Sequence, residues 1–316
     1  DLFAISGGPP CQGWSKVGRG KLRSLQDRAT SLLKDPRNRL YRQFVDHVRF
    51  FRPPVFVMEN VPGMLNLEGR NVAEEVLSNF EEAGYDTTFA IVNARWFGVP
   101  QDRRRLIFIG VRDDLGTRIE TEELEQFGVR FRSAFAGLPG ETNLRQAIAD
   151  RPEVPHGIRE DPQPYRPKPG RRSHFAELMR RRSNGVVTDH VCRKHNDQDL
   201  EAFALMDQGG QYHELPDHLK RYRDDIFKDK YKKLYWDRPA WTVTAHFAKD
   251  VYTHIHPDQP RTISIREAAR LQSFPDDFRF HGNMGDRFRQ IGNAVPPLMA
   301  WGIAEFIGES LETNLT

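Results

Sequence analysis

The chain opens with Asp1-Leu2-Phe3-Ala4-Ile5-Ser6-Gly7-Gly8-Pro9-Pro10-Cys11-Gln12-Gly13-Trp14-Ser15. A short apolar run, of the length of a buried strand, is followed by two glycines and two prolines, which end any strand or helix. Cys11 comes directly after this turn. An α/β fold keeps its ligands at the carboxyl ends of its parallel strands, so a thiol at this place is a candidate nucleophile. The turn by itself is equally compatible with a structural bend that carries a buried, inert cysteine.

Composition limits the classes of protein to consider. At 316 residues the chain suits one large domain or two of ordinary size. Hydrophobic residues make up 38% of it, and no apolar run approaches the roughly 18 residues of a membrane span, so neither a span nor a signal peptide is predicted. The two cysteines, Cys11 and Cys192, lie far apart in the sequence, which argues against a disulfide framework. We expect a cytoplasmic, DNA-associated bacterial protein.

The first third of the chain alternates between helical and strand patterns. Apolar residues recur at three and four positions over residues 40–51, which predicts an amphipathic helix. A short buried strand is predicted at 55–58, a second helix at 72–83, and further strands at 87–93 and 106–111. This rhythm predicts an α/β fold with a doubly wound sheet.

From about residue 112 the character of the sequence changes. Residues 113–260 are charged, rich in Pro and Gly and poor in periodicity, with short β-like pieces such as 241–244. We interpret them as a second, irregular domain inserted into the first, which occupies residues 1–112. Residues 261–316 then form the edge of the insert and the return to the first domain.

Two helices are predicted in this returning segment. One covers about 264–272, with a capped start at Ser264 or Thr262 supported by Glu267. The other is an apolar helix over 298–307 that follows a turn at 290–297.

Three groups with chemical potential are predicted to lie at strand ends: the Cys11 thiol, the Glu59 carboxyl and the Arg105 guanidinium. Strand ends in a parallel sheet share one edge, so the three can converge although they are far apart in sequence. Isolated acidic and basic residues are more often surface groups, and convergence alone does not name a reaction.

Five segments resemble, in the same order, the motifs of the DNA (cytosine-5)-methyltransferase family of the bacterial modification type. They are Gly7-Gly8-Pro9-Pro10-Cys11-Gln12-Gly13-Trp14-Ser15, Met58-Glu59-Asn60-Val61-Pro62-Gly63, Gln101-Asp102-Arg103-Arg104-Arg105, Arg266-Glu267-Ala268-Ala269-Arg270-Leu271-Gln272-Ser273-Phe274-Pro275 and Gln290-Ile291-Gly292-Asn293-Ala294-Val295-Pro296-Pro297. The resemblance implies a Rossmann-like methyltransferase sheet, with a target recognition domain at residues 113–260.

The resemblance also implies the roles of the catalytic residues. Carbon C5 of cytosine is a weak nucleophile, so the ring is first activated by addition of the Cys11 thiolate at C6. Glu59 donates or shares a proton at N3, and Arg105 holds O2 while Arg103 supports the same loop. Because C6 lies inside the stacked duplex, the target base must be flipped out.

S-adenosylmethionine is the implied methyl donor, and four residues match family contacts to it: Pro10, Leu40, Asn293 and Val295. The family's Phe-x-Gly-x-Gly turn and the acidic residues ending its next two strands have no counterpart here, so the first strands of the family sheet are absent. We expect a fragment of a longer enzyme; a partner chain supplying these strands is the alternative. Alone, residues 1–316 are expected neither to bind S-adenosylmethionine tightly nor to methylate.

Double-stranded DNA is the implied substrate, and the sequence leaves open whether a restriction endonuclease of the same system is a partner or the methylase acts without one. The segment 166–182 is strongly basic, and in the target recognition domain it is interpreted as contacting phosphates and grooves. The predicted DNA contacts are Gln12, Ser15, Arg166, Arg171, Arg172, Arg180 and Arg181. No metal site is expected, because Cys192-x-x-His195 lacks a second cysteine.

Two other functions remain open from the sequence. A tRNA cytosine-5 methyltransferase shares the fold, although Gln12-Gly13-Trp14-Ser15 resembles the DNA-acting form. A DNA-binding subunit without catalysis of its own would need a partner chain, and the intact Cys11, Glu59 and Arg105 argue against it.

Overall fold

The computed structural model describes residues 3–10, 39–65, 71–167, 170–221 and 230–315. The chain divides into two compact units. Unit 1 comprises Asp1–Asn93, Arg104–Gly128 and Gly302–Thr316, and unit 2 comprises Ala94–Arg103 and Val129–Trp301. Each unit is described separately below.

The described part of unit 1 is built on a four-stranded mixed sheet in the order β1-β2-β4-β3. Its strands are β1 (Ala4–Gly7), β2 (Val55–Asn60), β3 (Tyr85–Asn93) and β4 (Arg104–Arg112). Strand β1 is parallel to β2, whereas β4 is antiparallel to both β2 and β3. The predicted α/β sheet is therefore present, but its strands do not all run in one direction.

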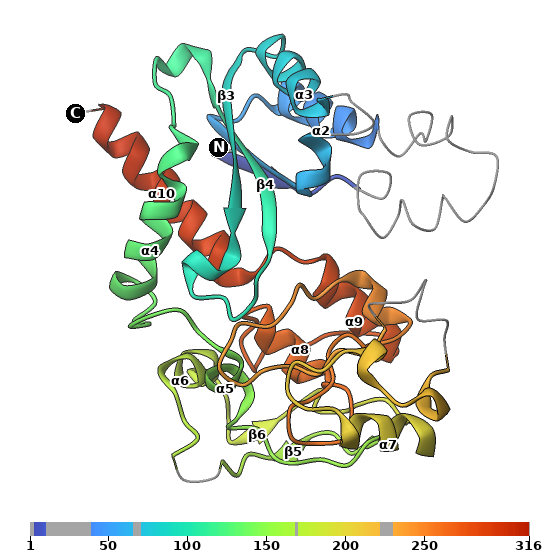
Figure 1. Cartoon of the computed structure of the whole chain (residues 1–316). Coiled ribbons are helices and arrows are strands. Elements are labelled where there is room, and N and C mark those ends of the chain that lie inside the picture. The colour runs from blue at the N-terminus through green and yellow to red at the C-terminus, as the bar shows by residue number, and fades with distance from the viewer. Residues whose placement is uncertain (1–2, 11–38, 66–70, 168–169, 222–229, 316) are drawn as a thin grey trace, which may run out of the picture. The chain divides into compact units, whose positions relative to one another are not determined.

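Helices α2 (Leu40–Phe51) and α3 (Val72–Glu81) lie together beside the sheet (Figure 1). Helix α2 begins and ends where the 3.6-residue periodicity predicted, because Arg52 adopts a left-handed conformation and Pro53-Pro54 follow. Helix α3 is capped by Asn71, whose side chain accepts from the Ala73 amide.

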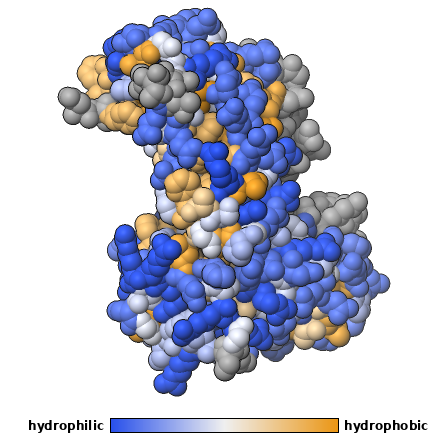
Figure 2. Space-filling model, turned by 90° about the vertical axis from the view of Figure 1, so that its left-hand side faces the viewer, coloured by the Kyte–Doolittle hydropathy of each residue, from blue (hydrophilic) through white to orange (hydrophobic). Residues whose placement is uncertain are grey.

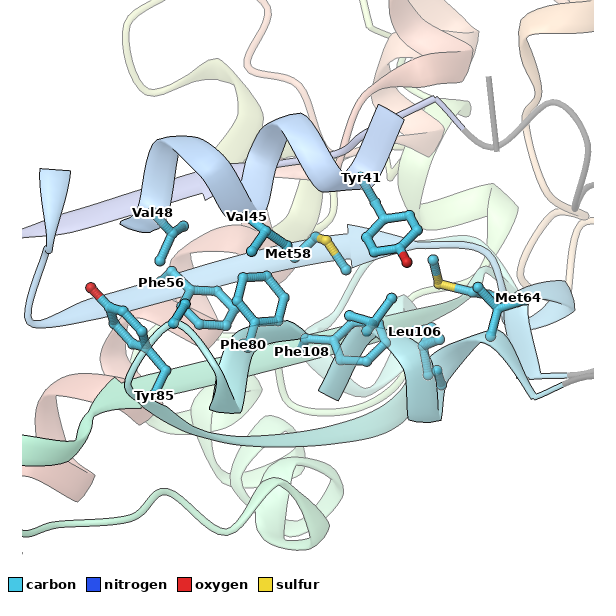
Figure 3. Close-up of a cluster of buried hydrophobic side chains, with 14 residues drawn as sticks. Tyr41, Val45, Val48, Phe56, Met58, Met64, Phe80, Tyr85, Leu106 and Phe108 are labelled. Carbon is cyan, nitrogen blue, oxygen red and sulfur yellow. The ribbon is translucent and has the colours of Figure 1, made fainter. Parts of the chain in front are cut away.

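The core of unit 1 lies between these helices and the sheet. Figure 3 shows Val45 and Val48 of α2 directed at Phe56 of β2, with Phe80 of α3 beside it. The rings of Phe56 and Phe80 stack with centroids 4.0 Å apart. The Phe56 ring fits because Gly110 lies opposite on β4, where a Cβ atom would come within 2.0 Å of that ring. This packing holds β2 and β4 in register.

Unit 2 contains more helix than the sequence indicated. Its described α-helices and strands are α5 (Leu144–Ile148), β5 (Gln163–Pro164), α6 (His174–Arg180), β6 (Val186–Val187), α7 (Asp197–Leu205), α8 (Ile265–Leu271) and α9 (Met284–Asn293). Helix α4 (Leu124–Ala134) begins in unit 1 and ends in unit 2, whereas α10 (Pro297–Leu315) begins in unit 2 and lies mostly in unit 1. On the face shown in Figure 2, hydrophilic residues predominate over unit 2. Long stretches of residues 113–260 are irregular, as predicted. Helices α4 to α7 within this range were not predicted, because helices of five to eleven residues leave too few turns for a clear periodicity.

Helix α8 starts as predicted. Ser264 caps it and Glu267 completes the capping box. The Glu267 carboxylate also binds both terminal nitrogens of Arg261, at 2.7 and 2.9 Å. Burial alone would raise the pKa of Glu267, but the Arg261 guanidinium holds that pKa far below its usual range.

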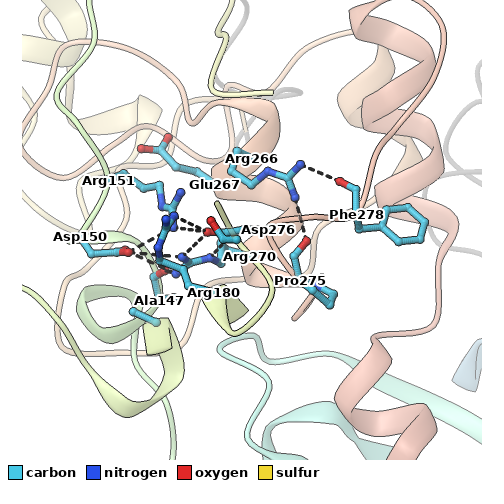
Figure 4. A network of polar contacts seen from close by, with 12 residues as sticks. Ala147, Asp150, Arg151, Arg180, Arg266, Glu267, Arg270, Pro275, Asp276 and Phe278 are labelled. Carbon is cyan, nitrogen blue, oxygen red and sulfur yellow. Dashed lines mark hydrogen bonds and ion pairs between the residues drawn. The ribbon is translucent and has the colours of Figure 1, made fainter. Parts of the chain in front are cut away.

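A buried network of arginines and aspartates joins α5, α6 and α8 (Figure 4). Arg270 binds Asp276 through Nε and Nη2, at 2.6 and 2.8 Å, and Arg151 Nη2 lies 2.6 Å from the same carboxylate. Asp150 completes the network on the other side of Arg270. Removal of one partner from a buried ion pair leaves the other charge buried and unpaired, which strongly destabilises the fold. The network therefore fixes the packing of these helices.

Two local predictions in unit 2 were wrong. Residues 241–244 form no strand in the structure, although Ala240 makes an isolated bridge to Gln101. Gly292 and Asn293, predicted to lie in a turn, are the last residues of α9.

Candidate active site

Glu59 and Arg105 form an ion pair at one edge of the sheet of unit 1. Arg105 Nε lies 2.7 Å from Glu59 Oε1, and the two side chains are 13% and 16% exposed. Glu59 is the fifth residue of β2, whereas Arg105 is the second residue of β4. The two meet because β4 is antiparallel to β2, so its start lies beside the end of β2. Of the three residues predicted to converge, Glu59 and Arg105 therefore lie together, but for Arg105 the reason is an antiparallel strand and not a shared carboxyl end.

The glycine-proline turn of the opening segment lies against this pair. Asn60 Nδ2 donates to the Pro9 carbonyl at 3.2 Å, while its Oδ1 accepts from the Val61 amide at 2.9 Å. A Cβ atom on Gly8 would lie 3.1 Å from Glu59 Oε2, so glycine allows the backbone to approach the carboxylate closely. Cys11, Gln12 and Ser15 lie outside the described residues.

Arg103 makes a separate set of contacts within unit 2. Its guanidinium donates to the carbonyls of Val243, Gly292 and Ala294, at 2.7, 3.2 and 3.0 Å. The residue is only 1% exposed. These contacts hold the end of α9 next to Asn293, whereas the sequence predicted that Arg103 supports the loop that carries Arg105.

Two buried glutamines strengthen the same region, and the sequence analysis gave neither a role. Gln101 Nε2 donates to the Leu271 carbonyl at 2.9 Å and its Oε1 accepts from the Val243 amide at 2.8 Å. Gln272 Nε2 donates to the Ile291 carbonyl at 2.7 Å. Both residues lie inside the segments that resemble family motifs, and this position in a motif was the available signal.

A cavity of about 660 Å³ lies in unit 1 beside β1 and α2. Pro10 and Leu40, two of the predicted cofactor contacts, line it together with Phe44 and His47. The Phe44 ring covers the backbone at Gly7, where a Cβ atom would come within 2.7 Å. A largely apolar cavity with an aromatic ring has the size and character of a nucleoside site, so these residues fit an adenosyl group. Asn293 and Val295 belong to unit 2.

The comparisons with known proteins agree with this chemistry. The family model for C-5 cytosine-specific DNA methylase matches residues 2–309. The chain belongs to this family. It is 35% identical to the type II methyltransferase M.DdeI of Desulfomicrobium norvegicum, over 97% of this chain and 72% of that protein. It is 34% identical to M.Bpa9945I of Bacillus paralicheniformis, over 96% of this chain and 69% of that protein.

Solved structures show the same fold. A structure described as a DNA modification methyltransferase encoded within an E. coli prophage matches with a TM-score of 0.69 and 25% identity, over 98% of this chain and 79% of that one. The Dnmt2 methyltransferase of S. pombe matches with a TM-score of 0.53 at 13% identity, over 98% of this chain and 79% of that one, which bears on the fold alone. The mixed α/β sheet of unit 1 agrees with a Rossmann-like methyltransferase fold.

The predicted basic DNA contacts of this methylase differ in their surroundings. Arg166, Arg172 and Arg181 are exposed and Arg171 is half-buried, so these four remain candidates. Arg180 is engaged in packing: its Nη1 lies 3.1 Å from Asp276 and its guanidinium lies 3.3 Å from the centre of the Tyr165 ring. We therefore no longer assign Arg180 to DNA.

Cys192 is buried and its thiol donates to the Pro155 carbonyl at 3.3 Å. Burial raises the pKa of this thiol, which makes it a poor nucleophile. Within the described ranges, no group of three or more His, Cys, Asp or Glu residues could hold a metal ion. In the same ranges, no helix is long and apolar enough to cross a membrane.

Proposed function

We propose that this methylase transfers a methyl group from S-adenosylmethionine to C5 of cytosine in a specific DNA sequence, through a covalent bond between Cys11 and C6 of a flipped-out base. The observation that carries the proposal is the Glu59–Arg105 pair, held at 2.7 Å beside the Gly8-Pro9-Pro10 turn that leads directly to Cys11. The family assignment supports DNA cytosine as the substrate.

Each group has one task in the proposed reaction. The Cys11 sulfur forms a bond to C6, and the electron pair of the C5–C6 double bond becomes available at C5. Glu59 shares a proton with N3 as negative charge develops on the ring. Arg105 donates to O2 and stabilises the same charge. After transfer, loss of the C5 proton restores the double bond and expels the Cys11 thiolate.

S-adenosylmethionine, when bound, supplies an electrophilic methyl group on a sulfonium. Pro10 and Leu40 would hold it within the cavity of unit 1, where Phe44 offers a ring for the adenine. Asn293 and Val295, the other two cofactor contacts that the family resemblance implies, belong to unit 2. The sequence-specific contacts belong to residues 113–260, and a restriction endonuclease of the same specificity is the proposed partner.

Covalent trapping tests this function. In duplex DNA with every cytosine replaced by 5-azacytosine, any recognised sequence contains a base that can trap the enzyme. Carbon C6 of 5-azacytosine reacts with a thiolate even when no methyl donor is present. We expect a denaturation-resistant complex between this DNA and the chain, visible on a denaturing gel. Cys11→Ser should abolish it, whereas Cys192→Ser should retain it.

Two results would count against the proposal. An adduct that persists in Cys11→Ser would assign the nucleophile to another residue. Equal trapping on azacytosine-containing tRNA and on duplex DNA would remove DNA as the preferred substrate.

A further inference from the structure

A second cavity, of about 480 Å³, lies wholly within unit 2 and has no part in the chemistry above. Arg159, Arg193, Lys194 and Lys249 line it, together with Asp250 and Tyr252. We call it the Arg193 pocket. Its residues come from four segments distant in sequence, and none was among the DNA contacts that the sequence predicted.

The charge of the Arg193 pocket is not balanced locally. Four cationic side chains line it against one carboxylate, Asp250. That carboxylate is shared with Lys230 Nζ at 3.5 Å and His246 Nε2 at 3.3 Å. Lys194 and Lys249 are exposed, and no carboxylate within the described residues pairs with either amino group. A concave site with one sign of charge concentrates the opposite charge.

Arg193 is fixed before any ligand arrives. Its Nη2 donates to the carbonyls of Phe247 and Ala248, at 2.8 and 2.9 Å, and its guanidinium lies 5.6 Å from the centre of the Phe288 ring. A held guanidinium loses little further entropy on binding an anion. The pocket therefore combines one positioned cation, Arg193, with the exposed cations Lys194 and Lys249.

Tyr252 gives the pocket an apolar wall. Its hydroxyl donates to Asp199 Oδ2 at 3.1 Å, which ties the polar end of the side chain to the protein. Met284 lines the same cavity. A ring and a thioether next to cations suit a group that is anionic on one side and apolar on the other, such as a phosphodiester flanked by deoxyribose.

We propose that the Arg193 pocket binds a phosphate of the DNA backbone. This inference rests on the proposed function, since it takes DNA as the substrate and adds a contact that orients it. The basic segment 166–182 is the other candidate for a phosphate contact, but Arg180 in that segment already pairs with Asp276 and lies over the Tyr165 ring.

The test measures DNA affinity of the full chain as a function of salt. Lys194→Gln and Lys249→Gln, combined in one variant, remove two rim cations that make no ion pair with a described carboxylate. Each neutralised phosphate contributes about 0.9 to the slope of log K against log salt, so loss of the single phosphate contact in the pocket should reduce the slope by about one, on every DNA sequence alike. Arg49→Gln with Arg118→Gln changes the net charge equally within unit 1 and should leave the slope almost unchanged.

A slope for the pocket variant equal to that of the control variant would overturn the proposal. Titration with inorganic phosphate alone distinguishes a free anion from DNA. Saturable phosphate binding that the pocket variant abolishes, with an unchanged DNA slope, would make this a free-anion site and also contradict the proposal. The proposed function is tested by a separate measurement, trapping of the wild-type chain on azacytosine DNA at saturating concentration. Absence of the Cys11 adduct there contradicts the proposed function, whereas the salt dependence of DNA affinity tests only the pocket.

Discussion

Arg103 and Arg105 lie two positions apart and bind different partners. Arg105 binds the Glu59 carboxylate within unit 1, whereas Arg103 binds three backbone carbonyls within unit 2. The family resemblance implied different roles for the two arginines, but the partners of Arg103 could not be predicted because they come from distant segments of the sequence. The structure separates a candidate catalytic residue from a positioning residue.

Substitution of Glu59 or Arg105 should reduce chemistry and spare DNA binding. Glu59→Gln removes proton transfer at N3, a contribution of about 10²–10⁴ in rate. Arg105→Lys removes the guanidinium contact to O2, with a loss of about 10²–10³. The measurement is the rate of azacytosine adduct formation at saturating DNA, with DNA affinity measured in parallel. Equal losses of rate and affinity would indicate a binding role instead.

Arg103→Ala should destabilise the protein. It leaves three carbonyls without their donor, and an unsatisfied buried polar group costs about 1–3 kcal/mol. We expect a loss of about 3 kcal/mol or more in the free energy of unfolding, measured by denaturant titration. Arg289→Ala is the control, because Arg289 is exposed and pairs only with Asp286 among the described residues; its effect should stay within about 0.5 kcal/mol. Similar effects of both substitutions would contradict the positioning role.

At the scale of elements, the end of α9 depends on a glycine. A Cβ atom on Gly292 would come within 2.2 Å of the Thr244 carbonyl carbon and 2.3 Å of the Ala245 nitrogen. Both are backbone atoms and cannot turn aside as a side chain would. The close approach explains why glycine stands inside a helix, where it otherwise costs about 1 kcal/mol relative to alanine.

Two glycine substitutions should therefore act in opposite directions. Gly292→Ala should lower the free energy of unfolding by about 1–3 kcal/mol or more, since overpacking forces the backbone apart. A Cβ atom on Gly308 in α10 would have no other atom within 4 Å. Gly308→Ala should therefore raise the free energy of unfolding by about 0.4–1 kcal/mol. Thermal unfolding midpoints of the two variants check both signs. Stabilisation by Gly292→Ala would show that α9 does not pack as closely as described.

Element positions were largely predictable, and their directions were not. The 3.6-residue spacing of Leu40, Phe44 and Val48 placed α2 correctly, and Ser264 with Glu267 placed the start of α8. The antiparallel direction of β4 was missed because a buried strand has the same composition in either direction. Arg180 was assigned to DNA because its partner Asp276 lies 96 positions away, beyond any local pattern.

At the scale of the whole molecule, buried histidines set a limit on stability in acid. Burial lowers the pKa of His195 and His254 to about 4 and that of His256 to about 3. Unfolded histidine has a pKa of about 6.5. Between these pKa values the unfolded chain therefore binds more protons than the folded chain. The stability that the neutral histidines contribute is complete above pH 6.5 and is lost as the pH falls toward 4.

The free energy of unfolding should fall by up to about 4 kcal/mol per pH unit near pH 5, because up to three histidines contribute about 1.4 kcal/mol each. Denaturant titrations from pH 7.5 to pH 5 measure this slope. His254→Gln should reduce the slope by about one proton, whereas His218→Gln, at an exposed position, should leave it unchanged. A stability independent of pH over this range would contradict the account.

The central claim is that Cys11, and not Cys192, attacks the base. The most direct measurement is to trap the chain on azacytosine duplex DNA, digest the complex and identify the modified peptide by mass spectrometry. We predict that the nucleotide is attached to Cys11, because Cys192 is buried with a raised pKa, while Glu59 and Arg105 lie beside the turn that leads to Cys11. Attachment at Cys192, or at any residue other than Cys11, would contradict it.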